Sequence, residues 1–161
     1  TQLLVQVTPE SFDGPTMIAT LRQQLQAQGV PGERLWLHAP EVKVFTHLRA
    51  AQQFLADVAP LGCRIGLEQF GSGLDSFQLL AHFEPQFLKL DRGFTSDLAA
   101  TRENIDRISQ ITARAQEAGI RTIAEFVSDA NSMTLLFSAG VDYVQGDFVG
   151  PALPSMNFDF G

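Results

Sequence analysis

The sequence predicts an α/β fold built on a parallel sheet, and two regularities of the chain indicate this class. Short apolar segments typical of strands alternate with longer segments in which apolar residues recur at helical spacing. The joints between a helix and the next strand are short and contain glycine, as expected for repeated βα units. About six units fit the 161 residues, whereas a complete eight-stranded barrel typically takes ~250 residues, so we expect an open sheet or an incomplete barrel.

The first two units are marked by the residues that begin and end their helices. Residues 3–8 predict a strand, and the helix after it begins at Pro15, because proline suits the first turn of a helix. That helix is expected to end at Gly29, since glycine readily adopts the left-handed backbone that follows a helix. Residues 34–39 predict the second strand, and Thr46 is expected to cap the helix of the second unit.

The later units repeat the same order of strand and helix. Strands are expected over residues 64–70, 87–92, 121–126 and 141–148. Helices are expected over residues 76–82 and 101–118, and from Ser128 or Asp129 to Ala139. Residues 149–161 have neither period and are expected to form a tail packed on the domain or on a partner.

Composition excludes several classes of protein. A net charge of −7 argues against a partner made of duplex DNA or RNA, which requires clustered Lys and Arg. Cys63 is the only cysteine, so a disulfide within the chain is impossible and a reducing, cytoplasmic setting is expected. No apolar run reaches the ~18–20 residues of a membrane span, so insertion into a membrane is not expected. Thr1 leads directly into an apolar strand, so further residues are expected upstream.

Every predicted strand ends in polar side chains. Taken in order, they are Gln6, His38, Glu68 with Gln69, Lys89 with Asp91, Glu125 and Gln145. Any one of them has a structural explanation, because strand ends are exposed and helix starts favour acids. Six in succession at the same edge of a parallel sheet indicate a functional site. Trp36 shares a strand face with His38 and is expected to pack in the interior of the barrel.

Four motifs make the resemblance specific. Residues 68–73, Glu-Gln-Phe-Gly-Ser-Gly, resemble the Asp-Asp-Phe-Gly-Thr-Gly motif of EAL domains, the cyclic di-GMP phosphodiesterase family. Residues 88–92, 122–125 and 140–146 are similar to that family's Leu-Lys-Ile-Asp-Arg, Val-Val-Ala-Glu and Gly-Ala-Asp-Tyr-Val-Gln-Gly. The resemblance implies a modified (β/α) barrel, incomplete in this chain, with residues 1–161 as the C-terminal two-thirds of one domain. The strand with the Glu-Ala-Leu signature is not in this sequence.

The same resemblance implies a chain without metal and without catalysis. Active members use two divalent metals to activate a water, and such hard cations require oxygen ligands. Here Gln6 stands where the family has a ligand Asn, His38 where it has a Glu, and Glu68 and Gln69 where it has two Asp. Ser128 replaces a further Glu of the family. The positions that are kept are Lys89, Asp91, Glu125 and Gln145.

Phe126 stands where active members have glycine, and it offers a flat face on which a nucleobase can stack. The alternative is that it packs against Val127 or a neighbouring helix. The chain most resembles the FimX-like receptors of type IV pilus control, which bind cyclic di-GMP without cleaving it. Because they sit at adjacent strand ends, Glu125, Phe126, Gln145, Gly150 and Pro151 are expected to line the pocket for this ligand, with Lys89 near a phosphate. Pro151 replaces an Arg of the family.

The resemblance also implies how such a receptor signals. We expect cyclic di-GMP as the ligand, no other cofactor, and a small PilZ-type adaptor as the protein partner in pilus and twitching control. Two alternatives stay open at this point. One is a weak metal-dependent phosphodiesterase, and the other is a pure interaction domain without ligand.

Overall fold

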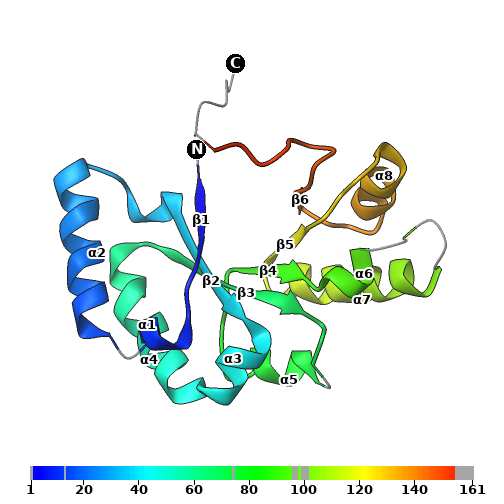
Figure 1. Ribbon diagram of the computed structural model, residues 1–161. Coiled ribbons are helices and arrows are strands. Elements are labelled where there is room, and N and C mark those ends of the chain that lie inside the picture. The colour runs from blue at the N-terminus through cyan, green and yellow to red at the C-terminus, as the bar shows by residue number, and fades with distance from the viewer. Residues whose placement is uncertain (1, 13, 74, 96–97, 99–101, 155–161) are drawn as a thin grey trace.

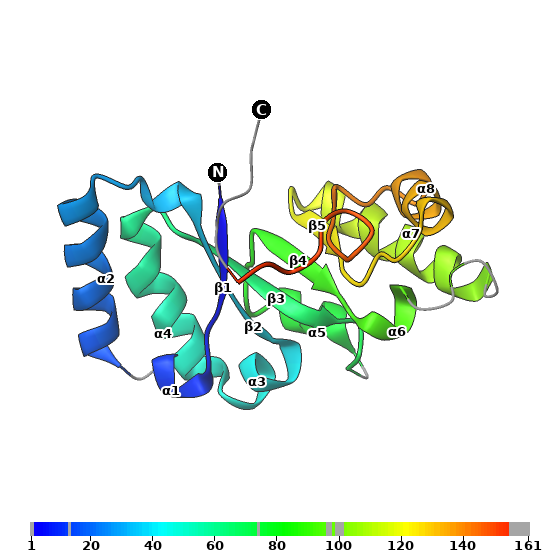
Figure 2. The same ribbon diagram turned by 45° about the horizontal axis from the view of Figure 1, so that its top comes forward.

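A single parallel sheet organises the chain. The structure, a computed structural model, describes residues 2–12, 14–73, 75–95, 98 and 102–154. Within these residues six strands pair in the order β1-β2-β3-β4-β5-β6. They are β1 (Leu3–Gln6), β2 (Leu35–Pro40), β3 (Arg64–Phe70), β4 (Phe87–Leu90), β5 (Arg121–Ala124) and β6 (Tyr143–Val144). The sheet curls like half of a barrel (Figures 1 and 2), which confirms the prediction of an incomplete barrel.

Helices connect successive strands and cover the outer side of the sheet. The described helices are α1 (Pro9–Phe12), α2 (Pro15–Gln28), α3 (Glu41–Thr46), α4 (Leu48–Val58), α5 (Ser76–Leu80), α6 (Arg92–Thr95), α7 (Arg102–Glu117) and α8 (Ala130–Ser138), with 3-10 turns η1 (Gly32–Arg34) and η2 (Ala59–Leu61). In Figures 1 and 2, α2 and α4 lie on the side of β1 and β2, and α7 and α8 lie on the side of β5. The left-handed backbone of Gly29 ends α2, and the Asp129 carboxylate accepts from the Ser132 N–H at the start of α8, both as predicted. No helix among the described residues has the length and apolar character to cross a membrane.

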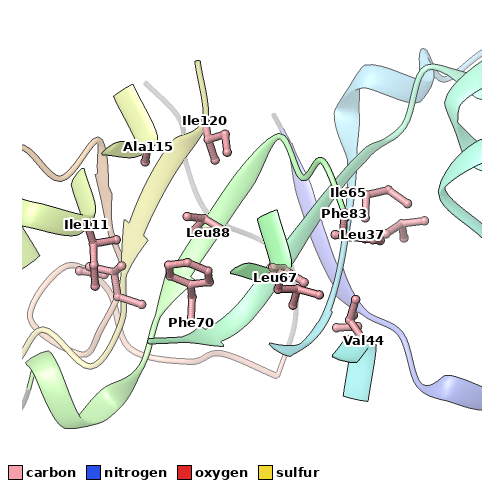
Figure 3. Close-up of a cluster of buried hydrophobic side chains, with 14 of the residues drawn as sticks. Leu37, Val44, Ile65, Leu67, Phe70, Phe83, Leu88, Ile111, Ala115 and Ile120 are labelled. Carbon is pink, nitrogen blue, oxygen red and sulfur yellow. The ribbon is translucent and has the colours of Figure 1, made fainter. Parts of the chain in front are cut away.

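The main core lies between the sheet and these helices. Figure 3 shows Leu67, Phe70 and Leu88 of β3 and β4 together with Ile111 and Ala115 of α7. Each of these side chains is buried. Because alternate side chains of a strand point to opposite faces, the residues between them face the concave side.

A second, smaller cluster occupies the concave side of the sheet. It consists of Trp36, Phe87 and Ile123, with Leu4 packed against them. The Trp36 and Phe87 ring centroids lie 4.9 Å apart. A Cβ at Gly66 would come within 2.4 Å of the Phe87 ring, so this glycine makes room for the aromatic pair. The interior position expected for Trp36 is confirmed.

Two helix predictions require correction or lie beyond the described residues. Thr46 does not cap the second helix, because residues 41–46 form a separate helix after Pro40. Its hydroxyl instead donates to the Val42 carbonyl at 2.9 Å, within its own helix. Thr101, where the helix over 101–118 was expected to begin, lies outside the described residues, as do residues 155–161 of the expected tail.

Several strands are shorter than predicted. β4 ends at Leu90, β5 at Ala124, and β6 spans only Tyr143–Val144. After β4 the chain enters α6 at once, and after β5 the backbone of Phe126 is left-handed, with φ of 62°. Asp91, Glu125 and Gln145, which were predicted to lie at the ends of strands, therefore lie just beyond them.

Candidate functional site

Two layers of side chains line the concave face of the sheet. The apolar layer contains Leu4, Trp36, Phe87 and Ile123. The residue two positions later along each strand faces the same side, one step closer to the carboxyl end of the sheet. This second layer is polar and contains Gln6, His38, Glu68, Lys89 and Glu125. The predicted strand-end residues thus share one face as well as one edge.

The first polar group joins β1, β2 and β3. Nε2 of Gln6 donates to Oε1 of Glu68 at 2.6 Å. Nδ1 of His38 lies 2.9 Å from Oε2 of the same carboxylate, without hydrogen-bond geometry. The His38 and Glu68 residues are only 5% and 8% exposed, so water cannot easily replace these partners. One oxygen of Glu68 is therefore hydrogen-bonded to Gln6, and the other lies against the His38 ring.

The second polar group joins β4 to the residue after β5. Nζ of Lys89 lies 2.7 Å from Oε1 of Glu125. The two side chains are 7% and 19% exposed, so this ion pair is largely removed from water. A pair of this kind holds both side chains in place, since removing one partner leaves the other charge buried alone.

These residues stand at positions where the resembling family holds metal ions in its active members. Their side chains do not fit a metal centre in this chain. Divalent cations such as Mg²⁺ require several free oxygen ligands. Here the Glu68 carboxylate accepts a hydrogen bond from Gln6 and lies against the His38 ring, and Glu125 is paired with Lys89. Within the described residues, no group of three or more His, Cys, Asp or Glu side chains is placed to hold a metal ion.

Asp91 and Gln69 do not complete such a centre either. Oδ1 of Asp91 accepts from the Gly93 N–H at 2.8 Å, so this carboxylate is turned toward the start of α6. Gln69 is exposed and has a left-handed backbone, with φ of 55°. Its side chain ends in an amide, which brings no charge to a cation.

Phe126 has an unusual conformation for its residue type. Its φ of 62° lies in the left-handed region, which glycine adopts freely and bulky residues rarely do. The residue is also 56% exposed, so burial does not compensate for the strain. Strained residues of this kind persist where the surrounding structure imposes them, and they gather at functional sites.

The segment after β6 imposes this conformation. The Gln145 N–H donates to the Ala124 carbonyl at 2.8 Å, and the Val127 N–H donates to the Gln145 carbonyl at 3.0 Å. The chain at Gly146 passes so close that a Cβ there would lie 2.3 Å from the Val127 backbone. Phe126 is thus held between two residues that are both tied to Gln145.

Arg92 completes the surroundings of Phe126. Its guanidinium carbon lies 4.8 Å from the centroid of the Phe126 ring, within the range of a cation–π contact. In the sequence analysis Arg92 appeared only as the last residue of the motif over residues 88–92, without a role of its own. The available signal was its position two residues after the end of β4, at the same edge of the sheet as Phe126.

Comparison with known proteins identifies the family. Residues 1–152 match the EAL domain. The chain belongs to the EAL domain family. The FimX EAL domain of Xanthomonas citri, solved in complex with c-diGMP, is 66% identical and has a TM-score of 0.96, covering 100% of this chain and 64% of that chain. The FimX EAL domain of Pseudomonas aeruginosa, solved bound to c-di-GMP, is 30% identical with a TM-score of 0.92, covering 100% of this chain and 66% of that chain.

Curated EAL relatives are more distant and much longer. The signaling protein YkoW of Bacillus subtilis is 26% identical over 96% of this chain and 19% of its own length. The cyclic di-GMP phosphodiesterase PdeF of Escherichia coli is 24% identical over 93% of this chain and 20% of its own length. The chain therefore spans about a fifth of the length of these relatives, and it covers only part of the EAL domain.

The structure brings together most of the residues predicted to contact a ligand in this EAL chain. Lys89 and Glu125 are in direct contact, and Phe126 follows Glu125 in the chain. Gln145 lies beside them through its backbone hydrogen bonds. The Gly150 N–H donates to the Gly146 carbonyl at 3.0 Å, which ties the following turn to the same segment, and Pro151 is exposed. That these residues bind a ligand stays a prediction.

Proposed function

We propose that this chain is the cyclic di-GMP-binding part of an EAL receptor that does not hydrolyse its ligand. The observation that carries the proposal is Phe126, a half-exposed aromatic residue held in a strained backbone at the polar edge of the sheet. An aromatic residue at a position that suits glycine lowers the stability of the fold, and such strain is typical of functional sites. The 66% identity with a FimX EAL domain solved with c-diGMP supports this ligand.

In this proposal each predicted contact has a distinct chemical role. The Phe126 ring stacks on a guanine base, an interaction worth about 1–3 kcal/mol per base. Glu125 accepts from the Watson–Crick edge of guanine or from a ribose hydroxyl, and the Gln145 amide can donate and accept at once. Lys89 supplies positive charge near a phosphate, and the Gly150-Pro151 turn borders the ligand.

A binding measurement tests this function. Calorimetry with cyclic di-GMP is expected to detect binding to the chain, and Phe126→Ala is expected to weaken it about tenfold to a hundredfold. The matched control is Phe137→Ala, another half-exposed phenylalanine, which lies on α8. Circular dichroism confirms that each variant is folded. Absence of binding by the unaltered chain would favour a pure interaction domain instead.

The proposed lack of hydrolysis rests on the engaged carboxylates. Gln6 donates to Glu68, Lys89 pairs with Glu125, and the described residues contain no group of three or more His, Cys, Asp or Glu side chains placed to hold a metal ion. Incubation with cyclic di-GMP and Mg²⁺ or Mn²⁺ is expected to yield linear dinucleotide only at background, with PdeF as the positive control. Turnover that a chelator abolishes would favour the alternative of a weak phosphodiesterase.

The proposal extends to signalling by protein contact. A receptor without chemistry acts by changing the affinity of another site for a partner. We expect a PilZ-type adaptor as that partner, in type IV pilus control, because the chain is similar to FimX EAL domains. We expect the protein in the cytoplasm, where the free thiol of Cys63 is stable.

Pull-down of a PilZ-type adaptor, with and without cyclic di-GMP, tests the expected partner. Failure in both conditions would refute this partner.

A further inference from the structure

We propose that Arg92 is a positioning residue for the aromatic ring of Phe126. Its guanidinium covers one face of the ring, so the base of the ligand stacks on the other face. The inference rests on the proposed function, because it concerns how the same site receives a purine base. Its basis is the contact between a guanidinium on the β4 side of the site and an aromatic ring on the β5 side.

The distance between the two groups decides which face a base can use. The guanidinium carbon of Arg92 lies 4.8 Å from the ring centroid of Phe126. A base inserted between them would need a van der Waals contact of about 3.5 Å on each side, and therefore a separation of about 7 Å. The base must therefore stack on the opposite face of the ring, and Phe126 as a whole is 56% exposed.

Arg92 is well placed to orient the ring because its own backbone is anchored. It is the first residue of α6, directly after Asp91, whose carboxylate accepts from the Gly93 N–H. The Asn104 amide also donates to the Gly93 carbonyl at 3.2 Å, which ties this turn to α7. An exposed aromatic side chain otherwise samples several rotamers, and fixing one in advance removes part of the entropic cost of binding.

A competing role for Arg92 is direct contact with the ligand. A guanidinium can hold a phosphate or the edge of guanine with two hydrogen bonds. In that case its contribution would not depend on Phe126. The positioning role requires the opposite, namely that the contribution of Arg92 disappears when the ring is removed.

A double-mutant cycle separates the two roles. Calorimetry with cyclic di-GMP is expected to show binding about threefold to tenfold weaker in Arg92→Gln. Arg92→Lys is expected to weaken binding nearly as much, because an ammonium keeps the charge but lacks the planar face of a guanidinium. In the Phe126→Ala background neither change is expected to weaken binding further. An Arg92→Gln effect that persists in full in that background, or full rescue by Arg92→Lys, would overturn the proposal.

A measurement without ligand keeps this inference distinct from the proposed function. NMR of the free chain labelled in its phenylalanine rings, with Phe126→Ala to assign the signal, reports the position of the Phe126 ring. Arg92→Gln is expected to move this signal toward that of a freely exposed phenylalanine, while signals of buried rings stay unchanged. An unmoved Phe126 signal would refute positioning by Arg92, whereas failure of the unaltered chain to bind cyclic di-GMP would refute only the proposed function.

Discussion

At the scale of single residues, Phe126 combines strain with exposure. A left-handed backbone at a non-glycine residue costs about 1–3 kcal/mol. Gln145 and Gly146 hold the neighbouring residues Ala124 and Val127, so the strain cannot relax locally. Stability is thus lowered at the one position where the proposed function needs a flat apolar face.

Phe126→Gly is therefore expected to change stability and affinity in opposite directions. Glycine relieves the strain but adds about 0.5–1 kcal/mol of unfolded-state entropy, so the free energy of unfolding should rise by about 1 kcal/mol. Binding of cyclic di-GMP should weaken as in Phe126→Ala, because the ring is lost in both. Urea unfolding followed by the fluorescence of Trp36, the only tryptophan, measures the first effect.

Phe126→Ala is the matched control for stability. Alanine keeps a Cβ, so it retains the strain and should give no gain in the free energy of unfolding. If Phe126→Gly lowers stability as much as Phe126→Ala, the contacts of the ring with the protein outweigh the strain, and the strain no longer argues for a ligand.

Sequence reasoning could find the residues of the site but not their pairings. A polar residue two positions after an apolar one on a parallel strand predicts a shared face, and this holds for Trp36 and His38. The contact of Gln6 with Glu68 spans three strands, so it depends on the curvature of the sheet. The strained backbone of Phe126 depends on Gly146, which lies 20 residues away in the chain and carries no local signal.

At the scale of elements, β6 depends on a side-chain clasp. Only two residue pairs, Ile123 with Tyr143 and Ala124 with Val144, register it against β5. Asp142, just before β6, accepts hydrogen bonds from the Thr122 N–H at 2.8 Å, the Thr122 hydroxyl at 3.0 Å and the Arg121 guanidinium at 2.6 Å. This clasp sets the register of the strand that carries Gln145 to the site.

The strand predicted over residues 141–148 is longer than β6, because apolar patterning does not reveal where backbone pairing stops.

The clasp should make stability depend on pH. Burial by itself raises the pKa of Asp142, but hydrogen bonds from Thr122 and Arg121 outweigh it and hold the pKa below its ordinary value. A carboxyl group with a lowered pKa in the folded state stabilises the fold above its unfolded pKa, about 3.9, and this contribution is lost as pH falls through the folded value. The free energy of unfolding should therefore fall as the pH drops below about 5.

Asp142→Asn provides the comparison for this effect. The variant should lose roughly 1–3 kcal/mol of stability at pH 7, because charge-assisted hydrogen bonds become neutral ones or are broken. Its unfolding free energy should also fall less steeply below pH 5 than that of the unaltered chain. Parallel pH curves for the two proteins, measured by urea unfolding, would show that the clasp does not contribute to acid sensitivity.

At the scale of the whole molecule, the sequence predicted the class of sheet better than its shape. Alternation of strands and helices indicated parallel βα units, but periodicity alone is compatible with an open sheet or an incomplete barrel. The curl accompanies close packing on the concave face, where Trp36 and Phe87 meet above the space left by Gly66. This packing involves β2, β3 and β4 together, so the sequence of a single strand does not reveal it.

The extent of the barrel leads to a final prediction about affinity. The chain aligns with 64% of the FimX EAL domain of Xanthomonas citri, so about a third of that domain has no counterpart in these residues. In a barrel, ligands contact loops from strands all around the rim. A partial rim offers fewer hydrogen bonds and less stacking, and the loss of one good contact, about 1.4 kcal/mol, weakens binding tenfold. Calorimetry in one buffer is therefore expected to give a Kd for cyclic di-GMP at least about tenfold higher for this chain than for that domain. Equal values, with both proteins folded by circular dichroism, would mean that the contacts that determine affinity all lie between β1 and the segment that follows β6.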